Sequence, residues 1–141
     1  MSQSNILEKV EKDIESYGWH VLAVCGGDLP NFSYTIGFKE TLSHPEIVMS
    51  GLSTEMMHHL LNDIGELIKS GESFSDGDTS SEVIKGYLVK FISVNESHID
   101  EYFRAANIHY GDGNFKTLQC IWPDNDGRFS ETTNSSQEVL V

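Results

Sequence analysis

Two groups of polar and aromatic residues have the chemistry of a binding or catalytic site, and the first contains Tyr34, Thr35, His44 and Glu46. A histidine beside a carboxylate can act as a general base or bind a metal ion, and the carboxylate then fixes the tautomer of the ring. The alternative is that His44 and Pro45 end a loop while Glu46 faces solvent. Because polar residues at the ends of small-faced strands are frequent in binding clefts, we predict a site here.

The second group contains Gln119, Trp122, Asp124 and Asp126. Trp122 could stack on a planar ligand, and the two carboxylates could receive polar groups or a cation. The alternative is that Trp122 packs beneath a hairpin turn that the carboxylates stabilise. We predict that the two groups share one ligand-binding cleft, which is lined by Tyr34, Thr35, His44, Glu46, Gln119, Trp122 and Asp124.

Each residue type suggests a role in this cleft. The aromatic rings of Tyr34 and Trp122 would supply stacking area. His44 and Glu46 would supply proton or hydrogen-bond chemistry, which leaves a small enzyme open as an alternative to a binding module. The remaining polar side chains, Thr35 and Gln119, would orient the ligand.

Metal and nucleophile motifs do not support a specific reaction. Six histidines and two cysteines occur, but neither a C-x-x-C nor an H-E-x-x-H motif is present. The chain also lacks a G-x-S-x-G elbow. Cysteine is often buried as a small apolar side chain, and this is our interpretation of Cys25 and Cys120, although they and the histidines could meet in space.

A flavin site is a further alternative. Residues 32–38, the loop that ends at His44 and Pro45, and the strand over 46–52 are similar in layout to split-barrel flavin-binding domains. The net charge of −13 opposes a phosphate-bearing ligand, and Arg104 and Arg128 are the only arginines. We therefore expect no cofactor, with FMN or a metal ion as the alternatives.

Hydrophobic periodicity predicts the elements that position these residues. Helices are expected over 6–17, 53–70 and 97–106, and strands over 19–25, 32–38, 46–52, 83–94 and 117–122. The first strand is apolar on both faces and is expected inside the sheet. Loops are expected over 39–45 and 71–82, and a turn over 107–114.

This order of elements favours an α+β fold. It predicts a mostly antiparallel sheet of about five strands, with three helices on one face, and curling toward a half-barrel is an option. Residues 1–129 would form one domain, since 141 residues suffice for a single core. Residues 130–141 are polar and would form a C-terminal tail.

Four ordered segments carry a family resemblance: YGW at 17–19, FSYTIGF at 32–38, HPEIVMSGL at 44–52 and LQCIWPD at 118–124. Over about residues 6–126 the chain resembles the bacterial family called domain of unknown function 4262. Members of that family carry Tyr-Thr-Ile-Gly-Leu, His-Pro-Glu and Trp-Pro-Asp segments in a similar arrangement. The resemblance implies no activity and no catalytic residue.

The composition bounds the partners of the chain. Twenty-two acidic residues against nine basic ones give a net charge of −13, which opposes binding to nucleic acid or anionic lipid. No apolar run approaches the roughly 20 residues that span a bilayer. Two cysteines make no disulfide framework, so a cytoplasmic location is expected. The charge leaves a second alternative, an inhibitor or immunity-type protein that binds a basic partner through the loop over 71–82.

Overall fold

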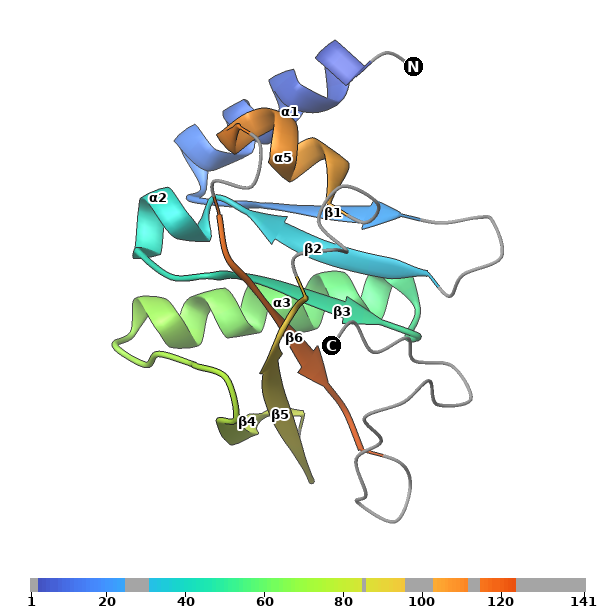
Figure 1. The fold of residues 1–141 in the computed structure, drawn as a ribbon, viewed down its shortest axis with the longest axis vertical. Helices are drawn as coiled ribbons and strands as arrows, with labels where there is room; N and C mark the ends of the chain where they lie inside the picture. Colours follow the sequence, from blue (N-terminus) through green and yellow to red (C-terminus); the bar gives the residue numbers. More distant parts are fainter. Residues whose placement is uncertain (1–2, 25–30, 85, 96–102, 112–114, 124–141) are drawn as a thin grey trace.

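The computed structural model describes residues 3–24, 31–84, 86–95, 103–111 and 115–123. These residues form four helices and six strands (Figure 1). In chain order the elements are α1 (Gln3–Ser16), β1 (His20–Val24), β2 (Phe32–Ile36), α2 (Phe38–Leu42), β3 (Glu46–Ser50), α3 (Thr54–Lys69), β4 (Thr79–Ile84), β5 (Tyr87–Ser93), α5 (Arg104–Tyr110) and β6 (Thr117–Ile121).

The strands form one open mixed sheet in the order β1-β2-β3-β6-β5-β4. Four of the neighbouring pairs are antiparallel, but β3 and β6 run parallel, with Glu46 opposite Thr117 and Val48 opposite Gln119. The α+β class is confirmed, whereas the prediction of about five mostly antiparallel strands is wrong in number and in this pairing. A parallel pair needs a long crossover, and here that connection contains strands, so no β-α-β alternation announces it in the sequence.

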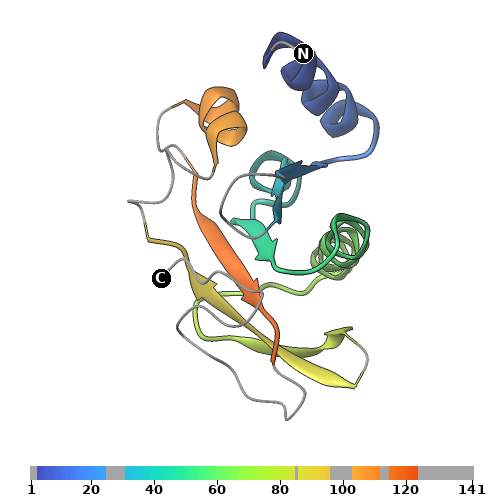
Figure 2. The same cartoon turned by 90° about the vertical axis from the view of Figure 1, so that its right-hand side faces the viewer.

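Helices cover both faces of the sheet, and not one face as predicted. One face is covered by α3 (Figure 2). This helix buries Met57, Leu61 and Ile64 in the larger core. On the other face, α1 and α5 contact each other and contribute Val10 and Ala106 to a second core. The described helices therefore number four, one more than predicted, and none of them is long and apolar enough to span a membrane.

Several elements follow their sequence signals. The helix α3 begins after Ser53, whose side chain accepts a hydrogen bond from the backbone N–H of Met56 at 3.1 Å. Strands β2, β3 and β6 lie within their predicted ranges. The strand β1 is also present, but it lies at the edge of the sheet and not inside it.

Other boundaries differ from the predictions. The predicted loop over 39–45 contains α2, and β4 begins inside the predicted loop over 71–82. The single strand predicted over 83–94 is a hairpin of β4 and β5, because Gly86 takes a positive φ of 87° and turns the chain. The third predicted helix is seen as α5 and extends into the predicted turn over 107–114. The start of the third predicted helix at Ser97, the Cys25 thiol and the tail over 130–141 lie outside the described residues.

A close contact between α3 and the start of β1 fixes the larger core. The Trp19 ring is 2% exposed and packs edge-to-face against Phe38, with ring centroids 5.3 Å apart. Its indole N–H donates to Asn62 Oδ1 at 2.9 Å. A Cβ added at Gly65 would lie 2.5 Å from Trp19 Cζ2, so the indole and α3 approach only because residue 65 is glycine.

We expect Gly65→Ala to lower the free energy of unfolding by about 1–3 kcal/mol, since the buried indole has no room to shift. Urea denaturation measures this loss. The matched control is Glu66→Ala on the exposed face of the same helix, for which we expect a change within about 0.5 kcal/mol. Equal losses in the two variants would contradict the close contact.

Candidate functional site

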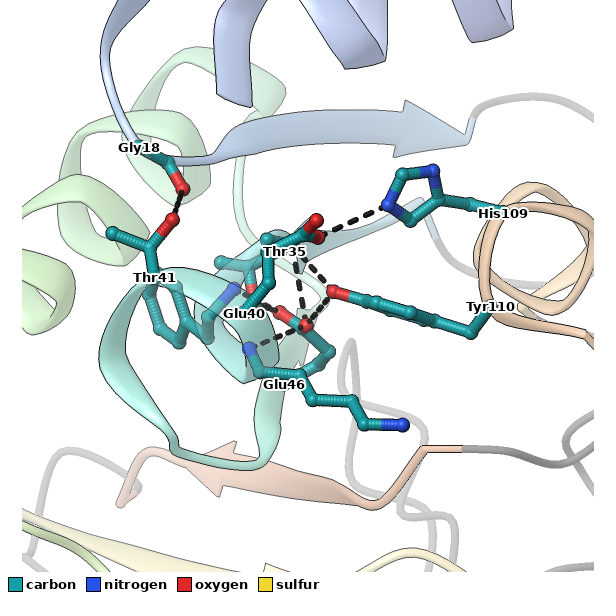
Figure 3. A network of polar contacts seen from close by, with 10 residues as sticks. Gly18, Thr35, Glu40, Thr41, Glu46, His109 and Tyr110 are labelled. Atoms are coloured by element: carbon teal, nitrogen blue, oxygen red, sulfur yellow. Dashed lines mark hydrogen bonds and ion pairs between the residues drawn. The ribbon is translucent and has the colours of Figure 1, made fainter. Parts of the chain in front are cut away.

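A buried carboxylate at the start of β3 is the centre of a polar network (Figure 3). Glu46 is 0% exposed. Its Oε1 accepts hydrogen bonds from the Thr35 hydroxyl at 2.7 Å and the Phe38 N–H at 3.1 Å. Its Oε2 accepts from the backbone N–H groups of Gly37 at 3.2 Å and Lys39 at 3.1 Å. The carboxylate therefore joins β2, β3 and the start of α2.

Local backbone geometry brings these N–H groups to Glu46. The first N–H groups of a helix have no acceptor inside it, and here the Glu46 carboxylate serves the first turn of α2 in place of a neighbouring cap. Gly37 precedes the helix with φ 121°, and a Cβ there would lie 2.8 Å from Gly18 O and Trp19 Cα. Only glycine fits this turn, so the small residue that follows β2 sets the direction of the N–H groups.

The Thr35 hydroxyl connects the two strands where their pairing ends. It accepts the Ile47 N–H at 3.0 Å and donates to Glu46 Oε1. The described β2–β3 register reaches only as far as Tyr34 opposite Val48, so the hydroxyl serves a backbone N–H beyond the end of the ladder. Both hydrogen-bonding roles of the hydroxyl are thus used inside the protein.

The helix α5 supplies the fifth donor. The Tyr110 hydroxyl donates to Glu46 Oε2 at 2.5 Å and accepts the Gly37 N–H at 2.8 Å. Lys39 Nζ lies 5.3 Å from the centroid of the Tyr110 ring, and His109 Nε2 lies 3.0 Å from Glu40 Oε1. Figure 3 shows Tyr110 pointing from α5 to Glu46, with the His109–Glu40 contact beside it. Two helices from distant parts of the chain therefore meet at this carboxylate.

The electrostatics of the network favour proton retention on the tyrosine. Burial raises the pKa of Glu46, and the hydrogen bonds from Tyr110, Thr35 and the α2 backbone oppose that rise. Burial and the adjacent Glu46 charge raise the pKa of Tyr110. Since five donors already point at the two Glu46 oxygens, the carboxylate is arranged to hold α2, α5 and β2 together and not to accept a proton from a substrate.

His44 occupies a different environment from Glu46. Its Nδ1 lies 2.8 Å from the Pro45 carbonyl oxygen, and its Nε2 accepts the Phe74 N–H at 3.0 Å. These partners assign the proton to Nδ1 and make the ring neutral. Burial lowers the pKa of His44. The side-chain hydrogen bonds of His44 and Glu46 have no partner in common, so the structure does not join them as an acid–base pair.

The other predicted site residues lie on both faces of the sheet. Tyr34 is 1% exposed and packs edge-to-face on Phe103, the residue before α5, and burial raises the pKa of Tyr34 to about 12. Trp122 packs with the core under α3, and its indole N–H donates to the Ser50 carbonyl at 2.9 Å. Gln119 points to the opposite face, and Asp124 lies outside the described residues. Of the predicted set, the structure joins Thr35 and Glu46, and a ligand-binding role for these residues stays a prediction.

Three polar side chains line up on the face of the sheet that points away from α3. Because Leu118 and Cys120 pack in the core under α3, their neighbours Thr117 and Gln119 point the other way, beside Glu46 of the adjacent strand. We call Glu46, Thr117 and Gln119 the polar row. Their exposed fractions are 0%, 6% and 0%. Within the described part of the chain, the Thr117 hydroxyl has no hydrogen-bond partner.

Sequence reasoning missed two members of this region. Tyr110 fell within a predicted turn, and no local pattern connects it with Glu46. Thr117 lay in a predicted strand without a role, although the alternation of Thr117 and Gln119 with Leu118 and Cys120 marks one polar face. That alternation was the available signal.

Metal and thiol chemistry find little support among the residues that the structure describes. In these ranges no three His, Cys, Asp or Glu side chains come close enough together to hold a metal ion. Cys120 is 0% exposed, and burial raises the pKa of its thiol. A buried thiol with a raised pKa is a poor nucleophile.

We expect Glu46→Gln to lower the free energy of unfolding by about 2–4 kcal/mol. In the wild type each carboxylate oxygen accepts hydrogen bonds from two or more donors. In either orientation, the NH₂ group of the new amide would replace one of these oxygens and face its donors. Thermal and urea unfolding measure the loss. Glu40→Gln is the control, because it removes only an exposed contact with His109 and should cost less than about 1 kcal/mol. A Glu46→Gln variant as stable as this control would contradict the assigned role.

The histidine predicts a pH dependence. Since the pKa of His44 is lowered from its ordinary value of 6.5, the unfolded chain binds the proton more tightly than the folded one. Stability should therefore fall as the pH drops below about 6.5, by up to about 1.4 kcal/mol per pH unit. His44→Gln keeps an acceptor for the Phe74 N–H and should flatten the curve between pH 7.5 and 5.5, whereas the exposed His59→Gln should not. The remaining titrating groups are shared by the wild type and the His44→Gln variant. If the stability of these two proteins changed with pH in parallel, the assignment of the pH dependence to His44 would be contradicted.

Comparison with known proteins gives one result. The sequence profile of the family described as "Domain of unknown function (DUF4262)" matches residues 13–135. No curated protein and no solved structure matches the chain significantly. The profile covers most of the chain and includes every element from β1 to β6. The chain therefore belongs to the DUF4262 family, a domain with no assigned function.

Proposed function

We propose that the protein is a ligand-binding module, and that its ligand lies against the polar row on the face of the sheet away from α3. The observation that carries this proposal is the hydroxyl of Thr117, a residue 6% exposed, which has no hydrogen-bond partner in the described residues. A buried hydroxyl that makes no hydrogen bond costs free energy, and a polar ligand against the polar row would satisfy this one. Glu46 lies opposite Thr117 on β3, and Gln119 lies two residues further along β6. Both side chains keep the surrounding face polar.

The contrast between the two faces supports this location. Under α3 the central strands present Ile47, Met49, Leu118 and Cys120, which form a continuous apolar core. The opposite face of the same two strands carries the polar row. Stability alone would favour apolar side chains on both faces of a covered sheet.

The chemistry of the row suggests the class of ligand. The Glu46 oxygens already accept five hydrogen bonds, and the row contains no basic side chain. The Thr117 hydroxyl can both donate and accept a hydrogen bond. We therefore expect an uncharged polar ligand with both donor and acceptor groups, such as an amide or a polyol, and not a phosphate.

Native mass spectrometry of the freshly purified protein, beside the denatured chain, tests this proposal. We expect an additional bound mass of a few hundred daltons on the wild type and its loss in Thr117→Val, which keeps the shape of the side chain and removes the hydroxyl. Thr117→Val should leave the free energy of unfolding unchanged or raise it by about 1 kcal/mol, because no described hydrogen bond is lost.

Two hydroxyls provide matched controls. Ser33 Oγ is also buried without a described partner, but Ser33 alternates with Phe32 and Tyr34 and so lies on the other face of the sheet. Ser33→Ala should keep the bound mass. Thr35→Val removes two hydrogen bonds and should cost about 1–3 kcal/mol. A wild type without bound mass, or equal retention in Thr117→Val and Ser33→Ala, would overturn the proposal.

A further inference from the structure

The helix α5 depends on its contacts with the rest of the protein. It has seven residues, and an isolated helix of that length is marginal in water. Its first residue follows Phe103, whose side chain makes no capping hydrogen bond. The helix is therefore stable only because it is packed on the rest of the protein. The strength of these contacts determines how often α5 detaches from the sheet.

Polar contacts hold α5 at both ends. At its first turn, the backbone of Ala105 and Ala106 lies beside the Tyr34 hydroxyl. At its last residue, the Tyr110 hydroxyl reaches Glu46. Between these ends, Ala106 and Asn107 of α5 are buried, while Ala105 and Tyr110 are partly buried against the second core beside Phe103.

The outer contacts of α5 add little. The His109–Glu40 contact leaves the Glu40 side chain 43% exposed, and Lys39 lies over the solvent side of the network. Exposed ion pairs are worth about 0–1 kcal/mol. The buried Tyr110–Glu46 hydrogen bond, in which one partner is charged, is the stronger attachment at this end.

We infer that α5 is a lid over the Glu46 end of the polar row, and that the hydrogen bond from Tyr110 to Glu46 is its latch. The lid explains how a ligand reaches side chains that are less than 10% exposed. The inference rests on the proposed function for its purpose, but its test requires no ligand. When the latch opens, the Gly37 N–H keeps an acceptor in Glu46 Oε2, so α2 and β2 stay in place.

Thiol labelling of two positions in one protein tests the lid. Val48 lies in the core under α1 and α5, opposite Gln119, whose chain neighbour Cys120 points into the core under α3. Both side chains are 0% exposed. In Val48→Cys, site-resolved labelling with a maleimide at neutral pH compares the two faces of the same part of the sheet. We expect the Val48→Cys thiol to react at least 10-fold faster than Cys120, because opening of the α5 face exposes it while the core under α3 stays closed.

Two further variants separate local opening from global unfolding. Adding Tyr110→Phe should raise the labelling rate of the Val48→Cys thiol about 5- to 30-fold, the effect of a latch worth 1–2 kcal/mol. Adding Gly65→Ala, which disturbs only the α3 side, should speed the labelling of Cys120 and leave that of the Val48→Cys thiol unchanged. If both thiols react at one rate, and both variants accelerate them equally, the lid is overturned.

The urea dependence of the labelling rate gives the same answer without a second substitution. Local opening exposes little surface, so the rate for the Val48→Cys thiol should change little in dilute urea, while that of Cys120 should rise steeply. Equal slopes would overturn the lid. The two labelling rates could depend equally on urea while the wild type still carries a bound ligand that Thr117→Val loses. That result would overturn the lid and leave the proposed function intact.

Discussion

The burial of one carboxylate constrains the centre of this protein. A charged group without water needs hydrogen-bond donors on every side, and Glu46 obtains them from a strand hydroxyl, three backbone N–H groups and a tyrosine. Each donor fixes the position of its element: Thr35 holds β2, the N–H groups hold the start of α2, and Tyr110 holds the end of α5. The glycine at position 37 follows from the same requirement, since only a residue without a side chain can present its N–H there.

This arrangement divides the protein into two halves with different properties. Under α3, aromatic and aliphatic side chains interlock closely enough that Gly65 lies in contact with the Trp19 ring. Under α5, a short helix is attached through the Tyr110 hydroxyl to a face that combines a second apolar core with buried polar side chains. The α5 half therefore holds, beside its own core, the polar row that stability alone would not select.

Much of the fold could be predicted from local patterns, but the site could not. The Ser53 cap and the apolar stripe of α3 are encoded within a few residues, and the same is true of the alternation in β2. The helix α2 has only five residues and one buried side chain, Phe38, so it has no detectable period. Glu46 and His44 are predicted site residues, but the side chain and the backbone that they contact, Tyr110 and Phe74, lie 64 and 30 positions away. Contacts at that separation depend on the topology of the sheet, which residue types alone do not encode.

The parallel pairing of β3 with β6 also has a consequence for how the chain acquires its structure. The central seam of the sheet pairs Glu46 with Thr117, and the chain between these two residues contains α3, β4, β5 and α5. A contact of such long range is entropically slow to close. On the ribosome, the unpaired edge of β3 has to wait for nearly all of the described chain to be synthesised. During that interval β3 is an unpaired edge strand, and the charged side chain at its first residue disfavours pairing with another chain.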